Sequence, residues 1–149
     1  MKMLVTIMFN KSFHGGGIMA LFEVKPLPKF SFPNGSGVDI LNGPLHHNEF
    51  GCLAIFSVSP KGVRANHYHT DKVENVFAVA GAAKLVLVDV KTRVRQETEL
   101  RGDRPALVKI FPNVAHAFVN QGDETFTAIF YGEKPHLEDN PATVLYKVA

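Results

Sequence analysis

Residues 62–74 read GVRANHYHTDKVE, and they carry the strongest structural signal in the chain. Side chains alternate between the two faces of a strand, so His67 and His69 project to the same face. The tight turn expected after His69 starts a second strand, which returns Glu74 toward the two imidazoles. The stretch therefore predicts two neighbouring strands that share a polar site.

The rest of the chain shows short apolar runs, separated by Gly, Pro, Asn and Asp at intervals of about ten residues. Helical periodicity is almost absent, and this spacing is typical of a sandwich or barrel of strands. We therefore expect an all-β, single-domain protein, with one face of its strands lining a barrel. The expected strands are 21–24, 52–58, 63–69, 73–80, 83–90, 93–99, 106–111, 115–120, 125–131 and 143–148.

Composition excludes several classes of protein. The 149 residues suit one domain, and 46% hydrophobic residues exclude wholesale disorder. A net charge of +2 without a block of like charges gives no sign of a nucleic-acid or anionic-membrane partner. Charged residues interrupt the longest apolar stretch, 73–90, so no membrane span is expected. The single Cys52 cannot form an internal disulfide, which favours a reducing compartment, the cytoplasm.

The N-terminal residues differ in pattern from the rest of the chain. We expect an N-terminal extension at 1–19 and one folded domain at 20–149. The glycine run at 15–17 precedes a second methionine, Met19, which is one candidate for the natural start. The alternative is an additional strand, joined by a glycine hinge, that pairs with a partner sheet.

A third histidine lies in residues 110–120, IFPNVAHAFVN. His67, His69, Glu74 and His116 together form a mixed nitrogen and oxygen set suited to one divalent transition metal, either zinc, manganese, iron or nickel. Taken singly, each is equally a hydrogen-bonded core histidine or a strand-end ion pair. Four such groups on buried strands are costly unless they are paired, protonated or bound to an ion, which favours the metal over a metal-free polar site.

Two motifs resemble those of the cupin superfamily. The histidines at 67–69, followed by Glu74 and Gly81, resemble the first cupin motif, and residues 112–120 resemble the second. The resemblance covers about residues 50–132. It implies a double-stranded β-helix, the cupin jelly-roll barrel.

The chain departs from the cupin pattern in two places. Gly62 is one residue closer to His67 than usual, and Asn113 stands where the second motif has glycine. Asn tolerates a positive φ angle, so we expect the turn at Asn113 to form.

A narrower resemblance is to cupins that act on nucleotide-linked sugars. Residues 66–74 are similar to the cupin domain of capsular-polysaccharide assembly proteins, and 112–118 resemble the 3,5-epimerases and 3,4-ketoisomerases of deoxysugar biosynthesis. Residues 139–143, DNPAT, resemble the closing segment of those enzymes. In the metal-free branches, the histidine that matches His67 is a base rather than a ligand, so both roles stay open.

Three functions fit these residues. The first is an epimerase or isomerase of a nucleotide-linked keto sugar in polysaccharide biosynthesis, working by proton abstraction beside the ketone. The second is a metal-dependent dioxygenase or small-molecule isomerase, and the third is a non-catalytic sugar-binding module. For the first, the expected catalytic residues are His67, Lys72 and His116, and the expected substrate-binding residues are Arg64, Phe118, Asn120 and Tyr131.

Two further expectations concern the acid and the assembly. Tyr131 and Tyr146 are candidates for the acid that returns a proton, and Arg64 or Lys72 for contact with a diphosphate. We expect a homodimer, because apolar residues on strand faces opposite the barrel interior need cover. The alternative is that a second sheet within the chain covers them. Those residues are Phe77, Val79, Val86 and Val88.

Overall fold

The computed structural model describes residues 20–26, 29–32, 35–38, 52–134 and 141–149. The expected extension at 1–19 lies outside these residues. The strands are β1 (Phe22–Pro26), β2 (Lys29–Phe32), β3 (Gly35–Val38), β4 (Cys52–Val58), β5 (Val63–His69), β6 (Glu74–Ala80), β7 (Ala82–Asp89), β8 (Arg95–Arg101), β9 (Ala106–Ile110), β10 (Val114–Val119), β11 (Phe126–Gly132) and β12 (Thr143–Leu145). The described chain contains strands and turns, and the all-β prediction is confirmed.

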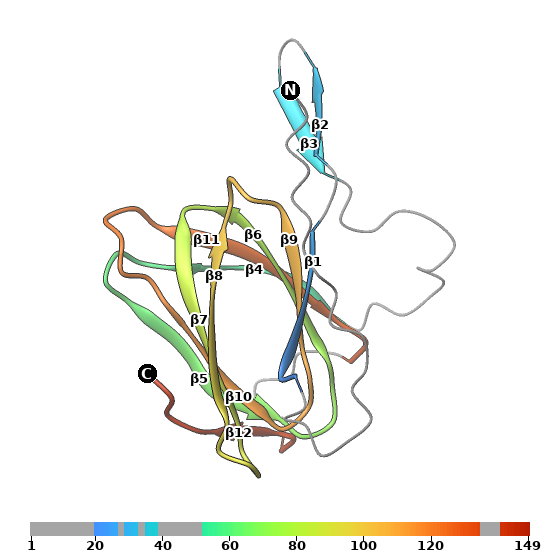
Figure 1. Ribbon diagram of the computed structural model, residues 1–149, viewed down its shortest axis with the longest axis vertical. Coiled ribbons are helices and arrows are strands. Elements are labelled where there is room, and N and C mark those ends of the chain that lie inside the picture. Colours follow the sequence, from blue (N-terminus) through green and yellow to red (C-terminus); the bar gives the residue numbers. More distant parts are fainter. Residues whose placement is uncertain (1–19, 27–28, 33–34, 39–51, 135–140) are drawn as a thin grey trace.

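Two antiparallel sheets of five strands each face one another (Figure 1). One has the order β1-β9-β6-β11-β4 and the other the order β12-β5-β10-β7-β8. The strands that carry the two motifs are split between the sheets, since β5 and β10 lie in the second and β6 in the first. The hairpin of β2 and β3 stands away from both sheets (Figure 1). In the described part of the chain, no helix has the length and apolarity to span a membrane.

The core lies between the sheets because alternate side chains of each strand point inward. Apolar residues from both sheets are almost fully buried there. The outward positions are polar along β8 but partly apolar on β6 and β7. The largest buried apolar members are Leu21, Val58, Val76, Leu85, Leu87, Val108, Ile110 and Phe126. Among the described residues, the buried polar or charged side chains are His69, Lys72, Glu74, His116 and Asn120.

Part of the argument for a dimer is wrong, because two of the apolar residues on which it rests are buried within this chain. Phe77 and Val86 are 9% and 1% exposed, so this chain already covers them. Val79 is 47% exposed, as that argument requires. The most exposed apolar side chains nearby are Leu53 and Ile55 of β4, an edge strand of the first sheet.

A turn at Gly81 and the expected turn at Asn113 both form with left-handed backbone angles. Gly81 joins β6 to β7 with a φ of 68°, and a Cβ there would lie 2.6 Å from the carbonyl oxygen of Thr125. Asn113 has a φ of 62°, which confirms that asparagine takes the left-handed conformation where glycine is usual. Each turn leads into a strand that carries a site residue or that pairs with such a strand.

Candidate active site

A β-bulge in β5 sets the position of the first histidine. Ala65 and Asn66 both have left-handed backbone angles, with φ of 76° and 54°. In the pairing with β10, His67 lies opposite His116 and Ala65 lies opposite Ala117, so Asn66 is the additional residue. Such a conformation is costly for alanine, and bulges of this kind re-aim side chains next to functional sites.

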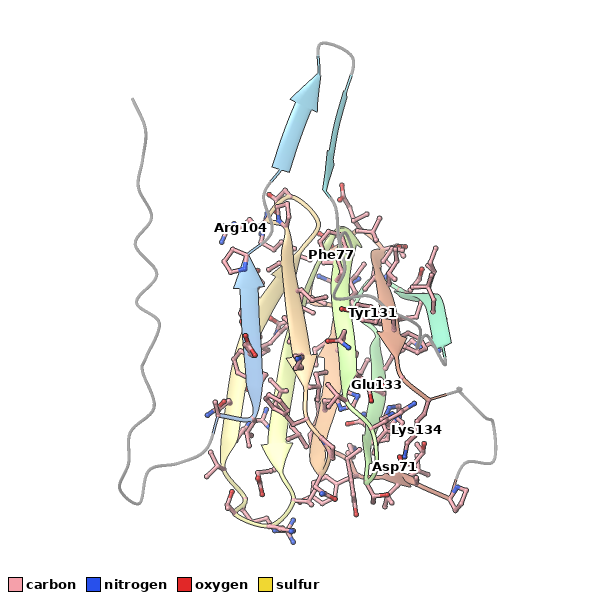
Figure 2. The ribbon with its side chains drawn as sticks, turned by 90° about the vertical axis from the view of Figure 1, so that its right-hand side faces the viewer. Asp71, Phe77, Arg104, Tyr131, Glu133 and Lys134 are labelled. Atoms are coloured by element: carbon pink, nitrogen blue, oxygen red, sulfur yellow. The ribbon has the colours of Figure 1, made fainter. Side chains whose placement is uncertain are left out.

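Three of the expected ligands converge from three strands. His67 of β5, Glu74 of β6 and His116 of β10 each offer an atom, and these atoms lie within 4.8 Å of one another. The loop between β5 and β6 brings Glu74 across from one sheet to the other. An ion pair of 2.7 Å between Asp71 and Lys134 anchors that loop (Figure 2). The sequence prediction that Glu74 returns toward the histidines is correct.

The tautomer of His116 is fixed by its own strand. Its Nδ1 lies 3.1 Å from the carbonyl oxygen of Val114. A carbonyl only accepts, so Nδ1 carries the proton that it donates. In the neutral ring, Nε2 therefore presents a lone pair to the site, 3.2 Å from Oε2 of Glu74. A lone pair beside a carboxylate oxygen calls for a proton or a cation between the two atoms.

His69 lies beside this group rather than within it. Its Nδ1 is 2.9 Å from the Oγ1 of Thr143, and its Nε2 is 3.0 Å from Oε1 of Glu74. The two groups at that short distance are not aligned for a hydrogen bond, so the buried Nε2 has no hydrogen-bond partner. An orphaned imidazole nitrogen that faces a carboxylate fits a site built to hold a cation.

The protonation states favour the same interpretation. Burial, with help from His116 and His69, lowers the pKa of the His67 imidazole to about 4. Burial alone would raise the pKa of the Glu74 carboxyl, but the imidazoles of His116 and His69 hold it well below its usual range. At neutral pH the site therefore presents a neutral His67 and an ionised Glu74, the forms that bind metals.

Lys72 lies close to Glu74 but outside the pocket. Its side chain is buried, and its Nζ is 3.7 Å from Oε1 of Glu74. It does not line the cavity formed by the histidines. Lys72 is thus placed to balance the carboxylate charge, rather than to contact a substrate as expected from the sequence.

A cavity of about 130 Å³ opens beside the three converging groups. Its polar end holds His67, Glu74 and His116, and its other end is aromatic. Phe56 packs against Phe118 with ring centroids 4.8 Å apart, and against Phe130 at 6.1 Å. The full lining is Phe56, Arg64, Ala65, His67, Glu74, Val76, His116, Phe118 and Phe130.

The residues that line the cavity include some of the expected substrate-binding residues and leave out others. Arg64 and Phe118 are at the cavity, as expected. Asn120 is buried elsewhere, because its amide donates to the carbonyls of Val58 and Glu124 and accepts from Gly122. It braces a turn and does not reach the cavity.

The tyrosines also lie away from the cavity. Tyr131 is on the outer face of the first sheet (Figure 2), since its neighbour Phe130 points inward. Tyr146 contacts Arg93 and packs on Tyr68 with ring centroids 6.1 Å apart. Neither tyrosine proposed as an acid is among the described residues that line the cavity.

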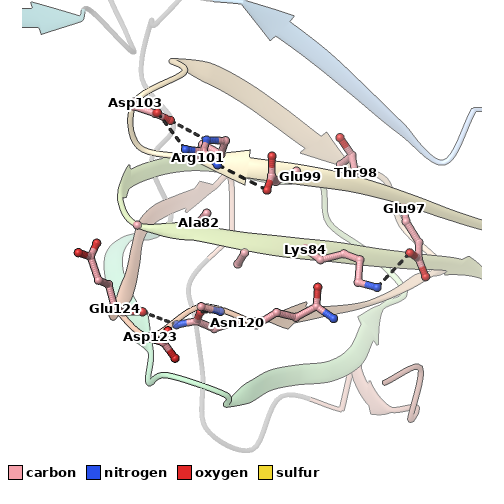
Figure 3. A pocket seen from close by; sticks show the side chains of 14 residues that line it. Ala82, Lys84, Glu97, Thr98, Glu99, Arg101, Asp103, Asn120, Asp123 and Glu124 are labelled. Carbon is pink, nitrogen blue, oxygen red and sulfur yellow. Dashed lines mark hydrogen bonds and ion pairs between the residues drawn. The ribbon is translucent and has the colours of Figure 1, made fainter.

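A larger hollow of about 900 Å³ lies on the outside of the second sheet, between β7, β8 and the turn after β10 (Figure 3). Its charged side chains are largely paired with one another, as in the pairs of Lys84 with Glu97 and Arg101 with Asp103. None of the three converging groups lines it. The smaller cavity is therefore the candidate active site.

The site residues fit a divalent metal. His67, Glu74 and His116 are the group that could hold it, and the orphaned Nε2 of His69 adjoins them. Imidazole and carboxylate together suit zinc, manganese, iron or nickel. The cavity of about 130 Å³ adjoins this group.

Comparisons with known proteins agree with this architecture. A family described as polysaccharide biosynthesis C-terminal domain matches residues 40–144. The spore coat polysaccharide biosynthesis protein SpsL of Bacillus subtilis (strain 168) is 29% identical over 125 residues, which cover 80% of this chain and 83% of SpsL.

Two solved structures share the fold. A dTDP sugar isomerase from Desulfovibrio desulfuricans G20 has a TM-score of 0.75 at 20% identity, covering 85% of this chain and 83% of that one. The capsular polysaccharide assembling protein CapF from Staphylococcus aureus has a TM-score of 0.63 at 22% identity, covering 83% of this chain. This chain spans 33% of CapF. The likeness confirms the cupin jelly-roll barrel.

Proposed function

The chain belongs to the polysaccharide biosynthesis C-terminal domain family, and on that premise we propose that it is a cupin enzyme that epimerises or isomerises a nucleotide-linked keto sugar. The observation that carries this proposal is the convergence of His67, Glu74 and His116 at one end of a cavity whose other end is aromatic. The imidazoles at one end of the cavity suit the sugar carbon that gives up a proton. The flat phenyl rings at the other end suit the apolar face of a sugar ring.

The chemistry needs one proton in and one proton out. A carbon next to a ketone loses its proton to a base, and in epimerisation the resulting enolate takes a proton back at the same carbon. In isomerisation the proton returns to the former ketone carbon, while the hydroxyl on the first carbon gives its proton to the former ketone oxygen and becomes the new ketone. His67 is neutral at neutral pH and lines the cavity, so it can accept that proton. No oxidant, reductant or second substrate is required, because atoms and electrons balance within the sugar.

Charge on the ketone oxygen must be stabilised. A divalent ion held by His67, Glu74 and His116 would supply positive charge at that oxygen. Where His67 is the base, the Nε2 of His69 can take its place as a ligand, because it lies 3.0 Å from Oε1 of Glu74 and His69 does not line the cavity. The assignment of base and ligand between these two histidines is part of the proposal.

The nucleotide part is proposed to lie at the cavity mouth. Arg64 lines the cavity, and its guanidinium donates to the carbonyl of Ser57 at 3.2 Å. That bond uses one of five N–H groups and leaves the others for a diphosphate. Two of the proteins with similar structures are a dTDP sugar isomerase and an epimerase in complex with dTDP-quinovose, which supports a nucleotide sugar as the substrate class.

We also propose a homodimer that works in the cytoplasm. The exposed Leu53 and Ile55 lie on β4, whose outer edge pairs with no described strand, and a second copy could cover both. Isologous pairing of two such edges would satisfy the backbone groups of both copies. A cytoplasmic site suits a nucleotide-sugar substrate and a single cysteine.

Incubation in deuterium oxide with a panel of nucleotide-linked 4-keto sugars tests the proposed function. Mass spectrometry and NMR should show deuterium at the carbon next to the ketone, and His116→Ala should abolish the exchange. Absence of exchange with every sugar, together with oxygen uptake on another substrate, would replace the isomerase by an oxygenase. Binding without exchange or oxygen uptake would leave a sugar-binding module.

A further inference from the structure

The C-terminal strand β12 contributes a side chain to the site from outside the cavity. Its pairing with β5 places Thr143 opposite His69. The Oγ1 of Thr143 lies 2.9 Å from Nδ1 of His69, whose ring is only 3% exposed. On the backbone, the N–H of Asn113 donates to the carbonyl of His69 at 2.7 Å. The imidazole is therefore held at its Nδ1 edge as well as through its main chain.

The surroundings of Nε2 of His69 indicate which atom donates the hydrogen bond between Nδ1 of His69 and Oγ1 of Thr143. If Nε2 carried the proton, that buried N–H would face Oε1 of Glu74 at 3.0 Å without the alignment of a hydrogen bond. An unsatisfied buried N–H is costly. If Nδ1 carries the proton, it donates to the hydroxyl of Thr143, and Nε2 presents a lone pair to the site.

We propose that Thr143 is a positioning residue, whose hydroxyl accepts from Nδ1 of His69 and so fixes the tautomer that turns the lone pair of Nε2 toward Glu74. The inference rests on the proposed function for its use, because a lone pair in that place serves a bound divalent ion. Thr143 would then do for His69 what the carbonyl of Val114 does for His116, because in both rings Nδ1–H donates to a protein oxygen. Two imidazoles from different strands then present the same nitrogen to one carboxylate.

The first experiment reads the tautomer in the metal-free protein. Long-range ¹H–¹⁵N NMR spectra at neutral pH distinguish a ring protonated at Nδ1 from one protonated at Nε2, and the His69 signals are those lost in His69→Gln. Wild-type protein should show Nδ1–H, because the Nζ of Lys72, 3.7 Å from Oε1 of Glu74, supplies positive charge beside the carboxylate when no metal is bound. Thr143→Val, which keeps the shape of the side chain, should move the ring toward the Nε2–H form, and Thr143→Ser should restore it. A wild-type ring protonated at Nε2, or a Thr143→Val spectrum equal to wild type, would overturn the proposal.

The second experiment measures zinc affinity by competition with a chromophoric chelator. Thr143→Val should bind Zn²⁺ about 10- to 100-fold more weakly, as is usual when the partner of a metal-binding histidine is removed. The matched control is Thr70→Val, which loses a hydroxyl near the carbonyl of Ala142 on the same stretch of chain but does not touch the ring. Equal losses in both variants would indicate general loosening and overturn the proposal. Absence of zinc binding in wild type would overturn the metal centre, while the NMR comparison would still decide the role of Thr143.

Discussion

The Nε2 atom of His116 lies 3.2 Å from Oε2 of Glu74, although the Nδ1 of that ring already holds the proton donated to Val114. Two atoms that both offer electron pairs do not rest at that distance unless a positive charge sits with them. Either an imidazolium proton or a metal ion meets this need. Metal content distinguishes the two.

Alanine at His116 should remove the metal. The variant loses one of three donors whose atoms lie within 4.8 Å, and the remaining pair cannot complete the site. Elemental analysis of folded protein should fall from about one ion per chain to near none. The matched control is Phe118→Leu, which changes the same cavity from the same strand without removing a donor. Equal metal content in His116→Ala and wild type would show that these groups are not a coordination sphere.

Acid should destabilise the metal-free protein between about pH 6.5 and pH 4. Burial lowers the pKa of His67 from 6.5 to about 4, so in this range the unfolded chain binds a proton that the folded chain does not. Stability is therefore fully present above pH 6.5 and falls as the pH falls. The low pKa of Glu74 acts in the same sense below its ordinary value of 4.5.

Urea unfolding with chelator present, at a series of pH values, measures this effect. His67→Gln removes the titrating group and should flatten the dependence between those limits. A variant that loses stability as steeply as wild type would assign the acid sensitivity to other groups.

The sequence could predict His67 and Glu74 from local rules, and His116 from the resemblance of residues 112–120 to the second cupin motif. The two-residue period of a strand places His67 and His69 together, and the turn after β5 returns Glu74. Their strands have nearly the predicted bounds, since β5 matches the expected 63–69, and β6 and β10 differ by one residue from the expected 73–80 and 115–120. The strands β2 and β3 are unexpected, and at four residues each they are too short for a two-residue period to stand out in the sequence.

The sequence could not predict the aromatic end of the cavity or the position of Tyr131. Phe56 reaches the cavity because β4 pairs with β11, a contact between residues more than 70 positions apart that no local pattern encodes. The face that Tyr131 occupies depends on strand register, and β11 shifts register against β6 between Thr127 and Ala128. The position of Lys72 could not be predicted either, because the path of a loop side chain depends on packing.

Glycine at Ala65 should stabilise the protein. Alanine with a φ of 76° carries strain that glycine lacks, and the gain should be about 0.5–1 kcal/mol in the free energy of unfolding. Ala54→Gly in β4 is the control, because Ala54 is not among the residues with positive φ, and glycine there should cost a similar amount. Urea unfolding measures both. Destabilisation of equal size in the two variants would contradict the assignment of strain to Ala65.

Lysine at Ile55 should convert the proposed dimer to a monomer. Ile55 is 69% exposed on the edge strand β4, and a charge there would have to be buried against the second copy. Leu145→Lys is the control, since Leu145 is 85% exposed on another strand. Light scattering should report a dimer for wild type and the control. A monomeric wild type at micromolar concentration would contradict the dimer, and a dimeric Ile55→Lys would move its interface elsewhere.

Glutamine at Arg64 should weaken the binding of a nucleoside diphosphate without removing the metal. Arg64 lines the cavity and has N–H groups left after its bond to Ser57, and a charge-assisted bond to phosphate is worth about 1.5–3 kcal/mol. Calorimetric titration with dTDP and UDP should therefore show a loss of about 10- to 100-fold, and salt should reduce the affinity of wild type more than that of the variant. Arg104→Gln, at an exposed arginine that does not line this cavity, should bind as wild type does. Equal affinities in wild type and Arg64→Gln would show that the diphosphate does not bind at Arg64. Equal losses of affinity in Arg64→Gln and Arg104→Gln would show that the loss comes from the change in net charge, not from a contact with Arg64.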